Sequence, residues 1–117
     1  MRMWLCDPKI LCRKHLLGMH LELHMFVGHM KAKRKITGFL KNNCLEPKIL
    51  KEQHDIIKNE LIRRNYKHRT PMTCEDVNIA LKYLTYCELE HKIDKDRSLS
   101  TLINRCEECR KRYNEII

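Results

Sequence analysis

The chain has 117 residues, which is enough for one modest hydrophobic core and too few for two. Hydrophobic residues make up 43% of it and only three Gly and three Pro occur, so the composition excludes a linker-rich or disordered protein. The sequence has no export signal and no apolar run long enough to span a bilayer. We therefore expect a single domain over residues 1–117, intracellular (cytoplasmic, in the nucleoid or virus-associated) and not secreted.

Positive charge is concentrated in one third of the chain. The net charge is +9, and residues 29–69 alone carry +8, whereas residues 70–117 carry −1. Such a concentration indicates a surface for a polyanion, most often nucleic acid. The alternative interpretation is a solvated, Lys-rich surface of a protein from an AT-rich genome.

A long helix is predicted at the N-terminal end. Asp7 is a suitable N-cap and Pro8 suits the first helical position, so the helix should run from there to about Met30. The residues expected on its core face are Ile10, Leu11, Leu17, Leu21 and Val27. Gly18 lies in mid-helix, where it indicates the close approach of a ligand or of a packed neighbouring helix.

The rest of the chain is also predicted to be helical. Residues 31–46 have the composition of a loop, and a second helix should run from Pro47 to about Arg64. A third helix should run from Thr73 to about His91, and a last one should begin at Ser98 or Ser100. No strand-like alternation occurs. We predict an all-α, compact single domain of three to four helices, with a long N-terminal helix and basic loops.

Basic and aromatic side chains supply the candidate DNA contacts, since cations bind phosphates and aromatic rings stack on bases. The candidates are Arg13, Lys14, Lys33, Arg34, Lys35, Arg63, Arg64, Tyr66, His68, Arg69, Arg110, Lys111, Arg112 and Tyr113.

Metal binding is not expected from the sequence. The seven Cys are interpreted as reduced thiols, and Cys106 and Cys109 form the single C-x-x-C pair, whereas a structural zinc usually has two such pairs. His20, His24 and His29 recur about one turn apart but are more often solvated or core-edge histidines. A redox or zinc-dependent interaction protein built on Cys106 and Cys109 stays open as an alternative.

The N-terminus itself is a candidate nucleophile. Met1 should be retained because Arg2 is large, and the mature chain would begin with a free α-amine beside a fixed positive charge. An α-amine is far less basic than a lysine side chain, so much more of it is neutral near physiological pH. A neutral amine can attack an electrophilic carbon and form a Schiff base.

Asp7 to Gly28 reads DPKILCRKHLLGMHLELHMFVG, and this stretch resembles the first helix of the pyrimidine-dimer DNA glycosylase family, the phage endonuclease V family. The match lies in His15-Leu16, Gly18 and Glu22-Leu23, at their expected offsets from the N-terminus. The ELIRRNYKHRTP segment that ends at Pro71 resembles the family's second long helix and its basic exit.

The resemblance implies a monomeric DNA-repair enzyme without metal or organic cofactor, which acts on double-stranded DNA with damaged bases or abasic sites. It implies glycosylase and AP-lyase chemistry: the N-terminal amine attacks C1′, the base leaves, and β-elimination of the imine cuts the strand. The catalytic residues would be Met1 as nucleophile, Arg2 as its electrostatic partner, Glu22 as the essential carboxylate and His15 as an orienting group.

Some positions depart from the family pattern. Met19 stands where the phage enzyme has a second acid, and Leu21 and Met25 replace flanking arginines. The lesion therefore stays open among a pyrimidine dimer, another damaged base and an abasic site. The alternative function is a non-catalytic nucleic-acid-binding protein.

Overall fold

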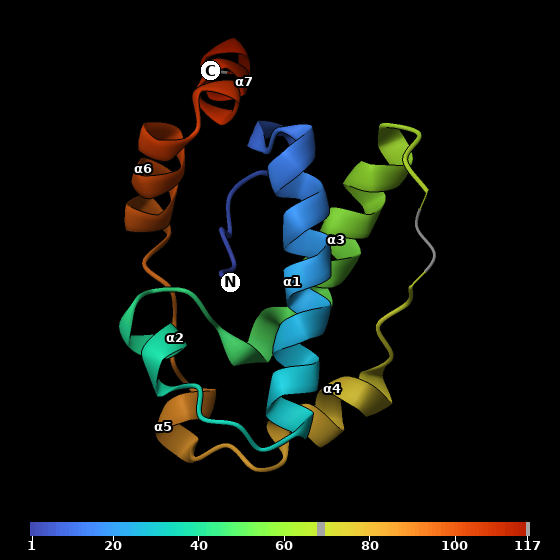
Figure 1. Cartoon of the computed structure of the whole chain (residues 1–117), viewed down its shortest axis with the longest axis vertical. Coiled ribbons are helices and arrows are strands. Elements are labelled where there is room, and N and C mark those ends of the chain that lie inside the picture. The colour runs from blue at the N-terminus through green and yellow to red at the C-terminus, as the bar shows by residue number, and fades with distance from the viewer. Residues whose placement is uncertain (68–69, 117) are drawn as a thin grey trace.

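A computed structural model describes residues 1–67 and 70–116 of the chain, and no strand occurs among them (Figure 1). The elements are η1 Pro8–Ile10, α1 Arg13–Lys31, α2 Thr37–Lys41, η2 Pro47–Ile49, α3 Leu50–Arg63, α4 Cys74–Leu81, α5 Tyr86–Leu89, α6 Lys95–Arg105 and α7 Glu107–Ile116. The all-α prediction is confirmed. The described helices outnumber the predicted three or four for three reasons. The predicted loop contains the short helix α2, the third predicted helix is divided into α4 and α5, and the C-terminal part forms two helices.

Helix α1 is the centre of the fold and packs against α3 and α4. Its buried face consists of Leu16, Met19, Leu23, Phe26, Val27 and Met30, which recur mainly at alternating spacings of three and four residues. The prediction that Leu17 and Leu21 belong to the core is wrong, since these side chains are 39% and 60% exposed. The 3-4 alternation that begins at Leu16 has more members than the stripe through Leu17 and Leu21, and it is the face that α3 and α4 cover.

The N-terminal segment runs between α1 and α6 (Figure 1). Met3 is fully buried and donates its N–H to the Cys44 carbonyl at 2.7 Å. The Ser98 hydroxyl of α6 donates to the Trp4 carbonyl at 2.6 Å. Hydrogen bonds to two different parts of the chain therefore hold residues 3 and 4, and they fix where the terminus lies.

The first predicted helix is interrupted. Asp7 is an N-cap, since its side chain accepts a hydrogen bond from the Lys9 N–H at 3.0 Å. The helix that it caps is only the single turn η1. Leu11 and Cys12 are extended, and α1 starts at Arg13. The Leu11 carbonyl accepts a hydrogen bond from the Arg64 guanidinium at 2.8 Å instead of continuing a helix.

Other predicted boundaries also shift. The helix expected from Thr73 to His91 is two helices, because Thr85 and Glu88 form a capping box that starts α5. The last helical region begins at Lys95, where Asp94 rather than a serine is the N-cap. The segment 31–46 contains the short helix α2. No described helix has both the length and the apolar character needed to cross a bilayer.

Candidate active site

The α-amine of Met1 lies beside the carboxylate of Glu22. The amine nitrogen is 3.9 Å from Glu22 Oε1, a distance typical of an ion pair and slightly too long for a direct hydrogen bond. The Met1 side chain is 16% exposed and the Glu22 side chain is 30% exposed, and both residues line one open cavity that a ligand can enter. Glu22 is placed by α1, and the amine is placed by the anchored segment that follows it.

A cavity of about 310 Å³ opens at this pair. It is lined by Met1, Arg2, Trp4, Lys14, His15, Gly18, Glu22 and Arg105. A Cβ added at Gly18 would meet no atom within 4 Å. Helix packing therefore does not explain this glycine, which instead keeps the wall of the cavity open one turn before Glu22.

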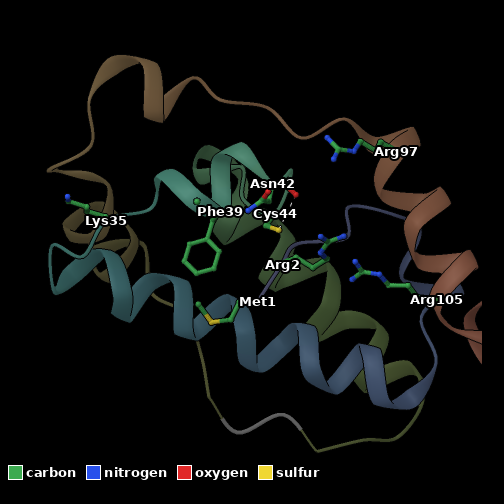
Figure 2. A pocket seen from close by; sticks show the side chains of 9 residues that line it. Met1, Arg2, Lys35, Phe39, Asn42, Cys44, Arg97 and Arg105 are labelled. Carbon is green, nitrogen blue, oxygen red and sulfur yellow. Dashed lines mark hydrogen bonds between the residues drawn. The ribbon is translucent and has the colours of Figure 1, made fainter.

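A second cavity of about 660 Å³ adjoins the first and shares Met1, Arg2 and Arg105 with it. Figure 2 shows Arg97 and Arg105 extending from α6 toward the side of this cavity on which Arg2 lies. Lys35 lines its other side, and Phe39 lies between Lys35 and Met1 in this view.

The two cavities are strongly cationic. Their lining includes the charged side chains of Arg2, Lys14, Lys35, Arg97 and Arg105, with Glu22 as the acid. Within residues 1–67 and 70–116, none of these five cations is engaged in an ion pair. Arg2 instead stacks over the Trp4 ring, with its guanidinium carbon 4.7 Å from the ring centroid. Five cations available around one carboxylate form a site for a polyanion such as a nucleic-acid backbone.

His15 lies on the wall of the smaller cavity, seven residues before Glu22 on α1. Burial lowers the pKa of its imidazole, repulsion from Lys14 lowers it further, and Glu22 opposes both effects. The neutral imidazole is therefore favoured near pH 7. Its Nδ1 is 3.2 Å from Cys12 Sγ, which leaves Nε2 as the nitrogen that can serve the cavity.

A model of the pyrimidine dimer DNA glycosylase family matches residues 1–73, more than half of the 117. The chain belongs to the pyrimidine dimer DNA glycosylase family. Membership implies a DNA-repair glycosylase that acts on DNA containing pyrimidine dimers. No curated protein and no solved structure matches the chain.

Several predicted DNA contacts of this glycosylase are exposed, and two of them line the cavities. Lys14 and Lys35 line the cavities themselves. Arg13 is exposed, and its guanidinium carbon lies 5.4 Å from the Tyr66 ring centroid. Lys33 and Arg34 are exposed after the end of α1, where the Lys33 ammonium lies 4.3 Å from the Tyr83 ring centroid.

Arg63 and Arg64 lie apart from the cavities and are already paired. Both hydrogen-bond to the buried carboxylate of Glu60, and Arg64 is only 9% exposed. Arg64 also donates to the carbonyls of Pro8 and Leu11. Arg64 therefore has a structural role, and we do not carry it into the proposed DNA surface.

The C-terminal candidates lie on α7 and mostly have intramolecular partners. Lys111 pairs with Glu107 and Glu108 at 3.7 and 3.8 Å, and Arg112 donates to the Lys9 carbonyl at 2.8 Å. Arg110 donates to the Ile103 carbonyl at 3.3 Å, and Tyr113 packs against the core. His68 and Arg69 fall outside the described residues.

Several residues that line the cavities were not identified from the sequence, among them Trp4, Arg97 and Arg105. Trp4 gives the smaller cavity an aromatic wall, and Arg97 and Arg105 bring cations from α6. A single Trp in a basic chain and two arginines eight residues apart on one helix are signals that the sequence does carry. Nothing in it places α6 beside the N-terminus.

Proposed function

We propose that this glycosylase uses the α-amine of Met1 as its nucleophile and Glu22 as the carboxylate that assists it. The proposal rests above all on the 3.9 Å between the amine nitrogen and Glu22 Oε1. The substrate is double-stranded DNA that contains a pyrimidine dimer, and abasic sites are also cleaved. The protein acts as a monomer, in the compartment or the virus that holds the DNA.

The proposed reaction begins when the neutral amine attacks C1′ of the damaged nucleotide. The glycosidic bond breaks, the base leaves with the bonding electrons, and positive charge develops on the sugar. A carboxylate at the position of Glu22 stabilises that charge. It also accepts the proton that the amine nitrogen loses on forming the new C–N bond.

The carboxyl group returns that proton to O4′ as the C1′–O4′ bond breaks, which opens the sugar ring and leaves a protonated imine. The imine acidifies the hydrogen on C2′. Removal of that proton by the same carboxylate, followed by loss of the 3′ phosphate, cleaves the strand by β-elimination. Arg2 keeps a fixed positive charge beside the amine, where it can bind a phosphate of the damaged strand. The Nε2 of His15 orients a sugar or phosphate oxygen within the smaller cavity.

The lining of the larger cavity suits the displaced DNA backbone. Arg2, Arg97 and Arg105 lie at the side shared with the smaller cavity, so phosphates flanking the damaged nucleotide can be bound while C1′ meets the amine. Attack at C1′ inside a regular duplex is sterically blocked, so the nucleotide must be extruded or the duplex kinked.

The substitution Glu22→Gln tests this assignment. It keeps the shape of the side chain and removes the proton acceptor, so we expect strand cleavage to fall by at least about 100-fold. DNA affinity should be unchanged within about twofold, because Glu22 binds no phosphate. Glu52→Gln, an exposed acid on α3, is the charge-matched control and should cleave like the wild type.

Retained cleavage in Glu22→Gln, at the rate of Glu52→Gln, would contradict the assignment. A wild-type protein that binds DNA tightly but cleaves neither dimer-containing nor abasic DNA would favour a non-catalytic nucleic-acid-binding protein.

A further inference from the structure

Four potential metal ligands from the two ends of the chain converge at the start of α1. Cys12 immediately precedes α1, His15 is in its first turn, Cys106 precedes α7 and Cys109 is in the first turn of α7. The ligand atoms of all four lie within 4.8 Å of one another. Cys109 is fully buried and the other three are half-buried.

Three of the distances between these atoms are close to those of a tetrahedral site. With Zn–S of about 2.3 Å and Zn–N of about 2.0 Å, tetrahedral angles set S–S at about 3.8 Å and S–N at about 3.5 Å. Cys12 Sγ and Cys106 Sγ are 3.8 Å apart. His15 Nδ1 is 3.2 Å from Cys12 Sγ and 3.6 Å from Cys109 Sγ.

Helix ends and backbone amides surround these sulfur atoms. Cys12 and Cys106 occupy the N-terminal ends of α1 and α7, where the helix dipoles stabilise negative charge. Two backbone amides point at sulfur: Cys12 N–H donates to Cys109 Sγ at 3.2 Å, and Cys109 N–H donates to Cys106 Sγ at 3.4 Å. Such hydrogen bonds are typical of the shell around metal-bound sulfur.

We propose that Cys12, His15, Cys106 and Cys109 bind one structural zinc ion. Three thiols lose their protons to solvent, and His15 binds through Nδ1 as the neutral imidazole. The ligand set is closed, with no position left for substrate. The ion joins α7, which lies outside the family-matched residues 1–73, to the start of α1.

A second consequence rests on the proposed function. Zinc at Nδ1 fixes the tautomer of His15, so that Nε2 carries the hydrogen and donates to a DNA oxygen in the cavity. The zinc site itself does not depend on glycosylase activity.

A second group of potential metal ligands consists of histidines and is less suited to a metal ion. His20, His24 and His54 also cluster, whereas His29 of the sequence-predicted trio instead faces the Lys35 carbonyl at 2.9 Å. His24 Nε2 and His54 Nε2 both lie within 3.2 Å of the Thr70 carbonyl, so these nitrogens are donors and not metal ligands.

The test is to measure the zinc content of the untagged whole chain by elemental mass spectrometry after gel filtration. We expect about one zinc ion per chain, as in other closed four-ligand sites. Cobalt substitution should give the intense near-ultraviolet absorption of cobalt–thiolate bonds. The variants Cys106→Ser and Cys109→Ser should each retain at least tenfold less zinc than the wild type. Cys74→Ser and Cys87→Ser, at exposed thiols of α4 and α5, should keep it, as should His24→Ala.

The wild type alone also decides the question if the serine variants do not fold. A chelator should release the ion and make three further thiols reactive toward a thiol reagent. The proposal is overturned if the protein carries no zinc and takes up none when zinc is supplied. A Cys12–Cys106 disulfide, seen as a loss of two hydrogens in the intact mass, would also overturn the proposal. So would wild-type zinc content in both Cys106→Ser and Cys109→Ser.

Discussion

Gly18 controls access to the amine–carboxylate pair. It lies one turn before Glu22 on α1, and its missing side chain leaves part of the smaller cavity open. Gly28 lies on the same helix, also without an atom near an added Cβ, but it does not line the cavities. The two glycines therefore separate the requirements of the helix from those of the cavity.

The substitution Gly18→Leu should lower strand cleavage by more than about tenfold, because the new side chain enters space that the nucleotide needs. Gly28→Leu should leave cleavage unchanged. Both variants should be as stable as the wild type or more stable by up to about 1 kcal/mol, since leucine favours the helix over glycine. Cleavage assays and thermal melting measure the two effects, and equal cleavage by both variants would exclude Gly18 from the substrate path.

The sequence predicts which side chains share a face of one helix. His15, Gly18 and Glu22 share a face of α1 because of their spacing, so their proximity follows from local geometry. Cys12 and the histidines are possible partners of Cys106 and Cys109 by residue type, but their scattered spacing does not predict that Cys12 and His15 lie beside that pair. That juxtaposition, like that of Arg105 with Arg2, depends on how α6 and α7 return to the N-terminal end.

The junction between α3 and the start of α1 depends on one buried ion-pair network. Glu60 binds both Arg63 and Arg64, and Arg64 reaches the carbonyls of Pro8 and Leu11. The hydrogen bonds from Arg63, with those from Arg64, lower the pKa of Glu60 to about 2. This contact explains why the predicted helix from Pro8 is interrupted before Arg13.

The substitution Glu60→Gln should lower the free energy of unfolding by about 3 kcal/mol at pH 7, because it leaves Arg64 without its buried counterion. A depressed carboxyl pKa contributes stability above the unfolded-state pKa near 4.5, and this is lost as pH falls toward about 2. The difference from wild type should therefore shrink across that range in urea titrations. A difference that stays constant down to pH 2 would show that Glu60 does not act through its charge.

Helix boundaries were less predictable than helical character. Periodicity and the proline and capping signals identified where helices occur, but Arg64 and the capping box of Thr85 and Glu88 decide where two of them are interrupted. The first of these is a contact between residues more than fifty positions apart. The sequence of residues 7–30 alone therefore cannot predict this interruption.

The whole molecule is flat, with extents of 41 × 30 × 17 Å. Its N-terminus lies in the middle of the broad view, between α1 and α6 (Figure 1). Cations from the N-terminal segment, helix α1, the loop after α1 and helix α6 line the cavities around it, so four parts of the chain contribute to one binding region. The +8 net charge of residues 29–69 indicated a polyanion surface but not the contribution of α6.

Replacing Arg105 with alanine should weaken DNA binding about equally for damaged and undamaged duplexes, because a phosphate contact carries no sequence information. The slope of log affinity against log salt concentration should fall by about 1. Lys111→Ala is the matched control, since Lys111 is exposed on α7 and already pairs with Glu107 and Glu108. An unchanged salt slope in Arg105→Ala would remove this arginine from the DNA surface.

In the proposed mechanism, the Met1 amine forms an imine with the damaged nucleotide. Borohydride trapping of the untagged protein on a duplex with a thymine dimer, an abasic site or no damage tests it most directly. We predict a covalent adduct on the two damaged duplexes and none on the undamaged one, with the modified residue identified as Met1 by mass spectrometry. The adduct should disappear when residues are added ahead of Met1. An adduct at a lysine, or tight binding to all three duplexes with no adduct, would exclude the Met1 amine as the nucleophile.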